Sequence, residues 1–153
     1  MTLSELLERD LVLVKTSCAS KDELIIKLLD KVYSKGEKPP FSQDEILKKI
    51  QIREKIGGTV FPSGLSAPHA RLLDYENFAL AVGTPMEPLF HEGIQIHLMA
   101  LMISSQSGGL YYLPALAGFT RISRDKEYFT RLCGAQNLEC FYSILQERDP
   151  ELG

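Results

Sequence analysis

Ile94-Gln-Ile-His-Leu-Met-Ala-Leu-Met-Ile103 contains the longest apolar run of the chain, and it predicts a strand in the interior of a sheet. A strand whose consecutive residues are apolar has to be covered on both of its faces. The run is far too short to cross a bilayer as a helix. We therefore expect a sheet with helices packed against both sides.

Further strand and helix patterns lie on either side of this run. Strands are predicted over 10–15 and 78–82, and helices over 3–7, 20–36, 42–57 and 113–119, from about Asp125 and from about Asn137. Two of the helices open with the Ser-x-x-Glu pattern of a capping box, at Ser20 and Ser42. The interleaved pattern predicts an α/β fold, a three-layer α/β/α sandwich with a mixed central sheet. We expect one domain over 1–153, with its core over about 3–147.

The amino-acid composition of the chain limits the classes of function that it can have. The chain has 153 residues, of which 44% are hydrophobic and 24% charged, values of a globular domain rather than a disordered one. The net charge of -3 argues against nucleic-acid binding, which needs a basic face. Residues 1–10 lack the basic and apolar regions of a signal peptide, so we expect a cytoplasmic location without membrane insertion. The three cysteines have no metal-ligand spacing and are expected to be reduced thiols.

The segment Gly57–Arg71 is the candidate functional site. It contains three glycines, two prolines and three hydroxyl residues around His69, which predicts a loop of defined shape. A neutral imidazole is a good nucleophile for a phosphoryl group, because its unperturbed pKa is about 6.5. Pro68 is expected to hold the ring at a strand end or loop mouth. We therefore predict that His69 accepts a phosphoryl group.

Groups that can stabilise a phosphate surround this histidine in the sequence. Arg71 is two residues away, and Arg53 at the end of the preceding predicted helix can fold back toward the loop. Thr59, Ser63 and Ser66 supply hydroxyls. Arginine, hydroxyl and backbone N–H groups are the usual partners of phosphoryl oxygens. We assign Arg53, Thr59 and Arg71 to phosphate stabilisation.

The other polar residues give weaker evidence for a functional site. His91 lies in a predicted turn and is expected at the surface, whereas His97 lies inside the predicted strand and is expected to be a core or sheet-face residue. The three histidines lack zinc-ligand spacing, so we predict no metal and no cofactor. The segment 104–109 lacks the lysine of a P-loop, which argues against ATP binding.

Two motifs resemble a known family. Ile52-Arg53-Glu54-Lys55-Ile56-Gly57-Gly58-Thr59 and Gly64-Leu65-Ser66-Ala67-Pro68-His69-Ala70-Arg71-Leu72 are similar to the signature of enzyme IIA domains of the bacterial sugar phosphotransferase system. The type is the fructose/mannitol class, and the second motif is most similar to its nitrogen-regulatory branch. The resemblance covers roughly 3–145. It implies an α/β/α fold and a phosphoryl group passed to His69 from an HPr-type phosphocarrier, with Arg53 near the phosphate.

The same resemblance implies a phosphotransferase component rather than a stand-alone enzyme. Sugar-transporting members pass the group to an enzyme IIB, and regulatory members bind a regulated target protein instead. This chain departs from the family at two places. It has Gly58 where the family usually has serine, and Tyr112 where many members have a second histidine. A tyrosine can donate a hydrogen bond to phosphate but carries no positive charge, so we assign Tyr112 to phosphate stabilisation.

Two alternatives stay open at this point. The first is a non-catalytic interaction module that retains the fold but has impaired phosphotransfer. The second is a hydrolase that uses His69 as a general base, with Glu54 or Asp74 as the nearest carboxylates in sequence. For partner binding we predict an exposed apolar patch formed by Phe61, Leu65 and Tyr111.

Overall fold

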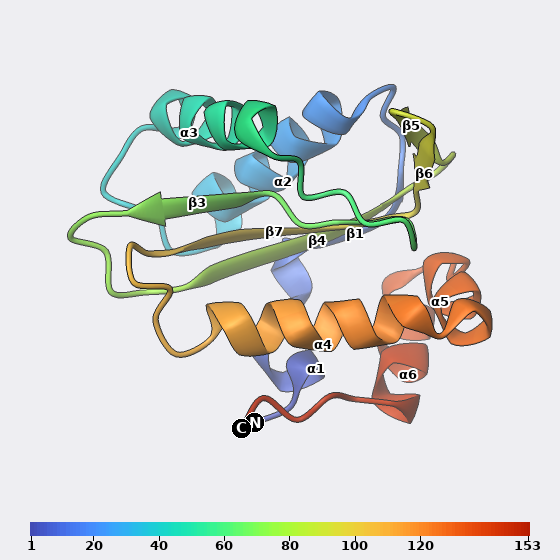
Figure 1. Cartoon of the computed structure of the whole chain (residues 1–153). Coiled ribbons are helices and arrows are strands. Elements are labelled where there is room, and N and C mark those ends of the chain that lie inside the picture. The colour runs from blue at the N-terminus through green and yellow to red at the C-terminus, as the bar shows by residue number, and fades with distance from the viewer.

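Five strands form the central sheet of the computed structural model, which describes residues 1–153 (Figure 1). The strands are β1 (Val12–Thr16), β4 (Ala79–Pro85), β7 (Leu98–Ser105), β2 (Leu65–Ser66) and β3 (His69–Leu72). Strand β1 is parallel to β4, and β4 is antiparallel to β7. The short strands β2 and β3 both pair in parallel with β7, one after the other along its length. The prediction of a mixed sheet is confirmed.

Strand β7 is covered on both faces. Leu98, Ala100 and Met102 belong to one buried cluster, and the alternating residues Met99, Leu101 and Ile103 belong to the other. All six side chains have an exposed fraction of 0%. Alternate side chains of a strand point to opposite faces, so an uninterrupted apolar run requires apolar packing on both sides. The prediction that this apolar run forms an interior strand is therefore confirmed for residues 98–103.

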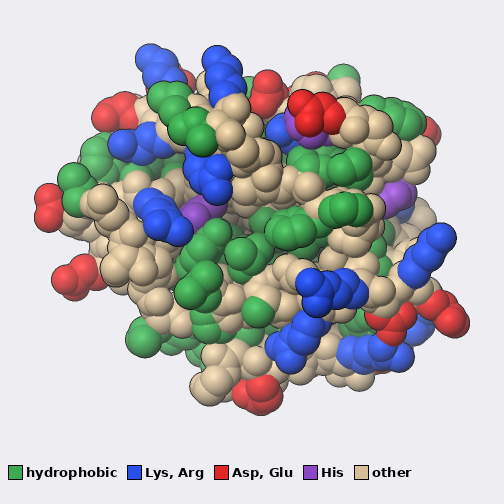
Figure 2. Space-filling model, viewed as in Figure 1, with side chains coloured by type: hydrophobic (Ala, Val, Ile, Leu, Met, Phe, Trp, Pro, Cys, Tyr) green, Lys and Arg blue, Asp and Glu red, His purple; other side chains and the backbone are tan.

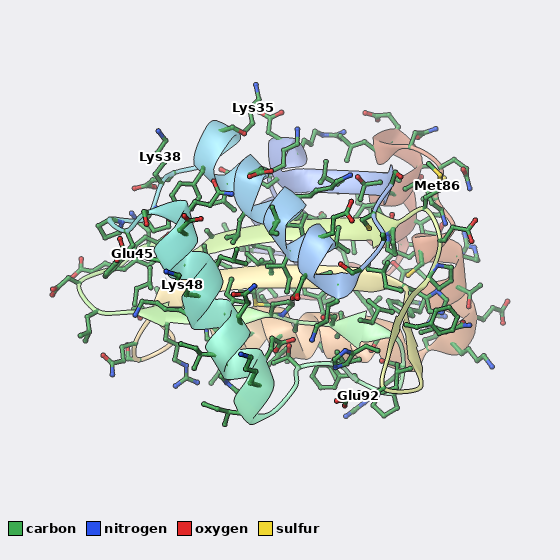
Figure 3. All side chains as sticks on the ribbon, turned by 90° about the horizontal axis from the view of Figure 1, so that it is seen from above. Lys35, Lys38, Glu45, Lys48, Met86 and Glu92 are labelled. Carbon is green, nitrogen blue, oxygen red and sulfur yellow. The ribbon has the colours of Figure 1, made fainter.

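Helices supply the two covering layers. One face carries α2 (Lys21–Lys35) and α3 (Gln43–Ile56), which lie across the strands in Figure 3. The other face carries α1 (Leu3–Leu6), α4 (Tyr112–Arg124), α5 (Lys126–Cys133) and α6 (Leu138–Glu147), and the 3₁₀ helix η1 (Arg9–Leu11) leads into β1. The predicted three-layer α/β/α sandwich is confirmed. No helix is long and apolar enough to span a membrane.

Side-chain caps confirm the predicted starts of α2, α3, α5 and α6, whereas α4 begins without a side-chain cap. At α3, the Ser42 hydroxyl accepts from Glu45 N at 3.2 Å while Ser42 N donates to the Glu45 carboxylate at 3.3 Å, which is a complete capping box. The Asn137 side chain accepts from Cys140 N at 2.8 Å at the start of α6. The box at Ser20 is incomplete, because the Glu23 carboxylate accepts from Ala19 N instead.

Two expectations about strands are wrong. The predicted strand 94–103 is interrupted at His97: Ile94–Ile96 is β6, which pairs with β5 (Leu89–His91) in a separate hairpin. His97 N donates to Gly64 O at 2.8 Å, which directs the chain into β7. An apolar pattern indicates which residues are buried, but it does not indicate where the chain changes direction. The bend at His97 therefore could not be predicted from it. The segment 57–71 also contains β2 and β3, which are too short to have a pattern of their own.

Candidate phosphoryl-acceptor site

His69 is the first residue of β3, a strand that pairs only with β7. Met102 N donates to Pro68 O at 2.9 Å, and His69 lies opposite Met102 in the parallel register. Ala70 and Leu72 pack with α2 and α3. Because side chains alternate along a strand, His69 and Arg71 project toward the layer of α4. The predicted position at a strand end is thus the observed one.

The imidazole of His69 is held by a serine and a tyrosine. Nε2 lies 2.7 Å from Ser104 Oγ, and Ser104 Oγ donates its proton to Ser105 O at 3.0 Å. When the serine proton is on this carbonyl, the serine oxygen accepts from Nε2, and the lone pair of that neutral tautomer is on Nδ1. The ring of Tyr112, at the start of α4, stacks on the imidazole with a centroid distance of 3.7 Å and an interplanar angle of 12°.

Two arginines set the electrostatics of the ring. Burial, and after it the positive charges of Arg71 and Arg53, together lower the pKa of His69 to about 4. Arg71 Cζ lies 6.0 Å from the centroid of the Tyr112 ring, and Arg53 Nη1 donates to Gly57 O at 2.7 Å. Figure 2 shows histidine atoms directly beside Lys and Arg atoms on this face. The site is a neutral imidazole in a positive environment.

The hydroxyl at Thr59 is oriented differently from the prediction. Thr59 Oγ1 donates to Glu54 Oε2 at 2.7 Å, and the other Glu54 oxygen lies 3.0 Å from Lys21 Nζ. This network ties the segment after α3 to the start of α2. The Thr59 proton is therefore committed to a carboxylate in this conformation. Ser104, whose hydroxyl does contact His69, was missed by the sequence analysis, where the only signal was a polar residue at the end of the buried strand.

Three predicted residues do not form the expected apolar patch. Leu65 has an exposed fraction of 0% and belongs to the core, so it cannot contact a partner, and its assignment was wrong. Phe61 and Tyr111 are half-buried; Phe61 packs against the core, and the ring of Tyr111 packs against Phe78. Leu65 is buried because β2 pairs with the interior strand β7.

Other apolar side chains are exposed near the site. Leu113 follows Tyr112 and is 68% exposed, Leu110 precedes it by two residues and is 82% exposed, and Leu73 at the end of β3 is 66% exposed. Leu113 is the second residue of the helix α4. Only the packing of α4 on the sheet shows that this residue faces solvent.

The other polar groups give no second active site around His69. Glu54 is engaged by Lys21 and Thr59, and Asp74 is exposed in a turn with φ of 56°. Ser104 is the hydrogen-bond partner of His69, so no carboxylate is placed to support the hydrolase hypothesis. No three His, Cys, Asp or Glu side chains converge on a metal-sized space. His91 is half-buried, with Nε2 3.9 Å from Glu92 Oε2, and His97 is half-buried at the strand break.

Residues 5–148 match the family model described as "Phosphoenolpyruvate-dependent sugar phosphotransferase system, EIIA 2". The chain belongs to this EIIA family. The match includes His69, both arginines and Tyr112, and it confirms the family that the two sequence motifs indicated.

Relatives of this EIIA domain include transport and regulatory proteins. It is 27% identical over 153 residues to the PTS system 2-O-alpha-mannosyl-D-glycerate-specific EIIABC component of Escherichia coli, covering 97% of this chain but only 23% of that protein. It is 24% identical to the nitrogen regulatory protein of Bradyrhizobium diazoefficiens, covering 95% of each. The fold is similar to enzyme IIAMTL of Escherichia coli, determined in complex with phosphorylated enzyme IIBMTL: the TM-score is 0.73 at 15% identity, over 93% of this chain and 98% of that one.

The low pKa of His69 predicts a pH dependence of stability for this EIIA domain. The unfolded state takes up a proton near pH 6.5 and the folded state only near pH 4, so unfolding is favoured as the pH falls through this window. The loss is on the order of 3 kcal/mol by pH 4 and is absent above pH 7. Urea unfolding of wild type and His69→Gln at both ends of the window measures it. We expect a steeper decline for wild type; equal declines would contradict the low pKa.

Proposed function

We propose that this EIIA domain carries a phosphoryl group on His69, which it receives from an HPr-type phosphocarrier in the cytoplasm. The observation that carries the proposal is a neutral imidazole with a free lone pair beside Arg71 and Arg53. A protonated ring would have no lone pair with which to attack, so a lowered pKa favours the acceptor state at neutral pH. The family membership supports the same chemistry.

The transfer step follows from this geometry. The free lone pair of the imidazole attacks the phosphorus of the donor's phosphohistidine, and a nitrogen–phosphorus bond forms on His69. The bond to the donor nitrogen breaks, and its electron pair returns to the donor imidazole. Arg71 and Arg53 stabilise the negative charge of the phosphoryl oxygens. Tyr112 holds the ring in place by stacking, and Thr59 contributes only if its hydroxyl leaves Glu54.

Partners are expected to dock around the exposed leucines. Leu73, Leu110 and Leu113 lie next to Arg71 and Tyr112 in the chain and offer apolar surface. Phe61 and Tyr111 contribute their exposed parts. We propose an enzyme IIB or a regulated target protein as the downstream partner. The similar fold of enzyme IIAMTL, determined with a phosphorylated enzyme IIB, supports the first of these. Phosphorylation adds about -1.5 to -2 charges to this surface, which is enough to change partner affinity.

The proposal is tested by labelling the wild-type protein. Incubation with an HPr-type carrier, enzyme I and radiolabelled phosphoenolpyruvate should transfer label to this chain. The label should be lost in acid and retained in alkali, as expected for a phosphoramidate. An unlabelled protein in an assay in which a known EIIA domain is labelled would reject the proposal.

Arg71→Gln is expected to slow phosphoryl transfer by about 10- to 100-fold, because one charge-assisted contact to phosphate contributes about 1.5–3 kcal/mol. Arg121→Gln is the matched control: Arg121 is an exposed arginine on α4 without a salt bridge, and its removal changes the net charge equally. Initial rates of labelling at fixed donor concentration give the comparison. Equal rates for the two variants would remove Arg71 from the site.

A non-catalytic interaction module is the second candidate. The observation that favours it is the cover over His69, which is only 5% exposed and has one ring face against Tyr112. In this case wild type stays unlabelled, while a pull-down partner binds wild type and His69→Gln with equal affinity. Labelled wild type with phosphorylation-dependent binding excludes this candidate.

A further inference from the structure

A second basic site lies at the other end of the sheet from His69. It is a cavity of about 550 Å³, formed where the tip of the 57–64 segment meets the C-terminal end of α4 and the helix α5. Figure 1 shows these three segments at the same end of the sheet. His97, on its rim, precedes by five residues the β7 position that pairs with His69. At about 3.3 Å per residue the two sites are about 17 Å apart.

The charges that line this cavity are all positive. Lys15, Arg124 and Lys126 line it, and no lining residue is acidic. None of the three forms a salt bridge. The carboxylate of Asp125, between two of them in sequence, caps Tyr128 N and pairs with Arg148 instead. Three unpaired cations around one concave surface form an anion-binding arrangement in a chain of net charge -3.

The backbone is distorted where Lys15 enters this wall. Lys15 has a φ of 53°, which is unfavourable for a residue with a side chain, and the pairing of β1 with β4 shifts register here. Lys15 N donates to Thr84 Oγ1 at 2.8 Å rather than to the strand ladder. A bulge of this kind redirects a side chain. It costs free energy that a regular strand would not, which suggests a use for the lysine where it stands.

The rest of the cavity lining includes hydroxyl side chains, an aromatic ring and a cysteine. The Ser63 hydroxyl donates to Ser123 Oγ at 2.8 Å and fastens the segment tip to α4. Phe129 is buried and supplies an apolar wall. Burial raises the pKa of the Cys133 thiol to about 12, so this sulfur stays protonated and unreactive. The lining therefore offers binding groups, and its cysteine is not a nucleophile.

We propose that this cavity binds a small organic phosphate monoester. The cations of Lys15, Arg124 and Lys126 would hold the phosphate dianion, and Phe129 would contact the organic part. The volume lies in the range of small-molecule sites and leaves space beyond a phosphate group. The site is independent of phosphoryl transfer to His69 and stands whether or not that transfer occurs.

The test is titration of the isotopically labelled protein with glucose 6-phosphate, glycerol 3-phosphate and AMP, followed by amide NMR. At least one ester is expected to shift the resonances of 123–134, while glucose, glycerol and adenosine do not. Inorganic phosphate is expected to bind more weakly than the best ester. No shift in 123–134 with any ester at millimolar concentration would overturn the proposal.

Variants then locate the binding. Arg124→Gln and Lys126→Gln are each expected to weaken binding of the best ester about tenfold or more. Both residues are exposed, so the fold should be retained, which circular dichroism checks. Lys48→Gln is the charge-matched control, because Lys48 is exposed on α3 at the other face of the sheet (Figure 3). His69→Gln should bind normally; if it alone abolishes binding, the ester occupies the His69 site and the proposal is wrong.

Discussion

His69→Gln is expected to lose the acid-labile phosphoryl label, with a rate at least about a thousandfold below wild type. Glutamine has no nucleophilic lone pair at its amide nitrogen, yet it is polar and can still contact Ser104. The other two histidines lie elsewhere, His91 in β5 and His97 in the wall of the second cavity, so they do not replace it. Labelling from a phosphorylated HPr-type carrier, measured as an initial rate, gives the result.

Matched variants separate the loss of the nucleophile from a loss of structure. His91→Gln removes a half-buried histidine from the β5–β6 hairpin and should be labelled at the wild-type rate. Thermal unfolding should show both variants folded at the assay temperature. Equal labelling of His69→Gln and wild type would place the phosphoryl group elsewhere and would sink the proposed mechanism.

Gly64→Ala is expected to destabilise the protein by about 2–4 kcal/mol. Gly64 has a φ of 98°, and a Cβ there would lie 2.8 Å from His97 Cδ2 and 2.9 Å from Gln95 O. The second contact is with backbone, which cannot rotate away. Gly64 O also accepts from His97 N, so a shift of residue 64 would disturb the turn into β7. Urea unfolding gives the change in free energy.

Two other glycines separate the cost of the positive φ from the cost of the close contact with His97 and Gln95. Gly93 has a φ of 83° with open space around it, so Gly93→Ala should show only the backbone cost of about 1 kcal/mol. Gly58 has neither a positive φ nor a neighbour within 4 Å, and Gly58→Ala should change stability by less than about 0.5 kcal/mol. If Gly64→Ala proves no less stable than Gly93→Ala, the close packing against His97 does not contribute.

The layers of the fold could be predicted because each depends on a local pattern. The consecutive apolar residues of β7 require cover on two faces, and Ser42 and Asn137 cap the helices that follow them. The break at His97 and the strands β2 and β3 could not be predicted. The break involves Gly64 O, which accepts from His97 N, and β2 and β3 form by pairing with β7. All of these contacts join residues more than 30 positions apart, and nothing local marks such a pairing.

The candidate site around His69 likewise has one part that the sequence predicts and another that only the folded structure shows. His69, Arg71 and Arg53 were found from the sequence alone, because they lie in or beside one segment rich in turn-forming residues and because that segment carries a family signature. The sequence likewise indicated Tyr112 through the family pattern. Its stacking on the imidazole, the bond from Nε2 to Ser104 and the burial that lowers the pKa of His69 arise only when β3, β7 and α4 meet.

The sequence by itself thus determined the fold class and the family of this protein, and it indicated His69 as the candidate nucleophile. The tertiary structure alone decided which apolar side chains face solvent, burying Leu65 and exposing Leu113, and it alone assembled the cavity of Lys15, Arg124 and Lys126. The physical reason is distance along the chain. Strand alternation and helix capping act over a few residues, whereas burial, stacking and clustered charge depend on residues that only the folded sheet and its helices bring together.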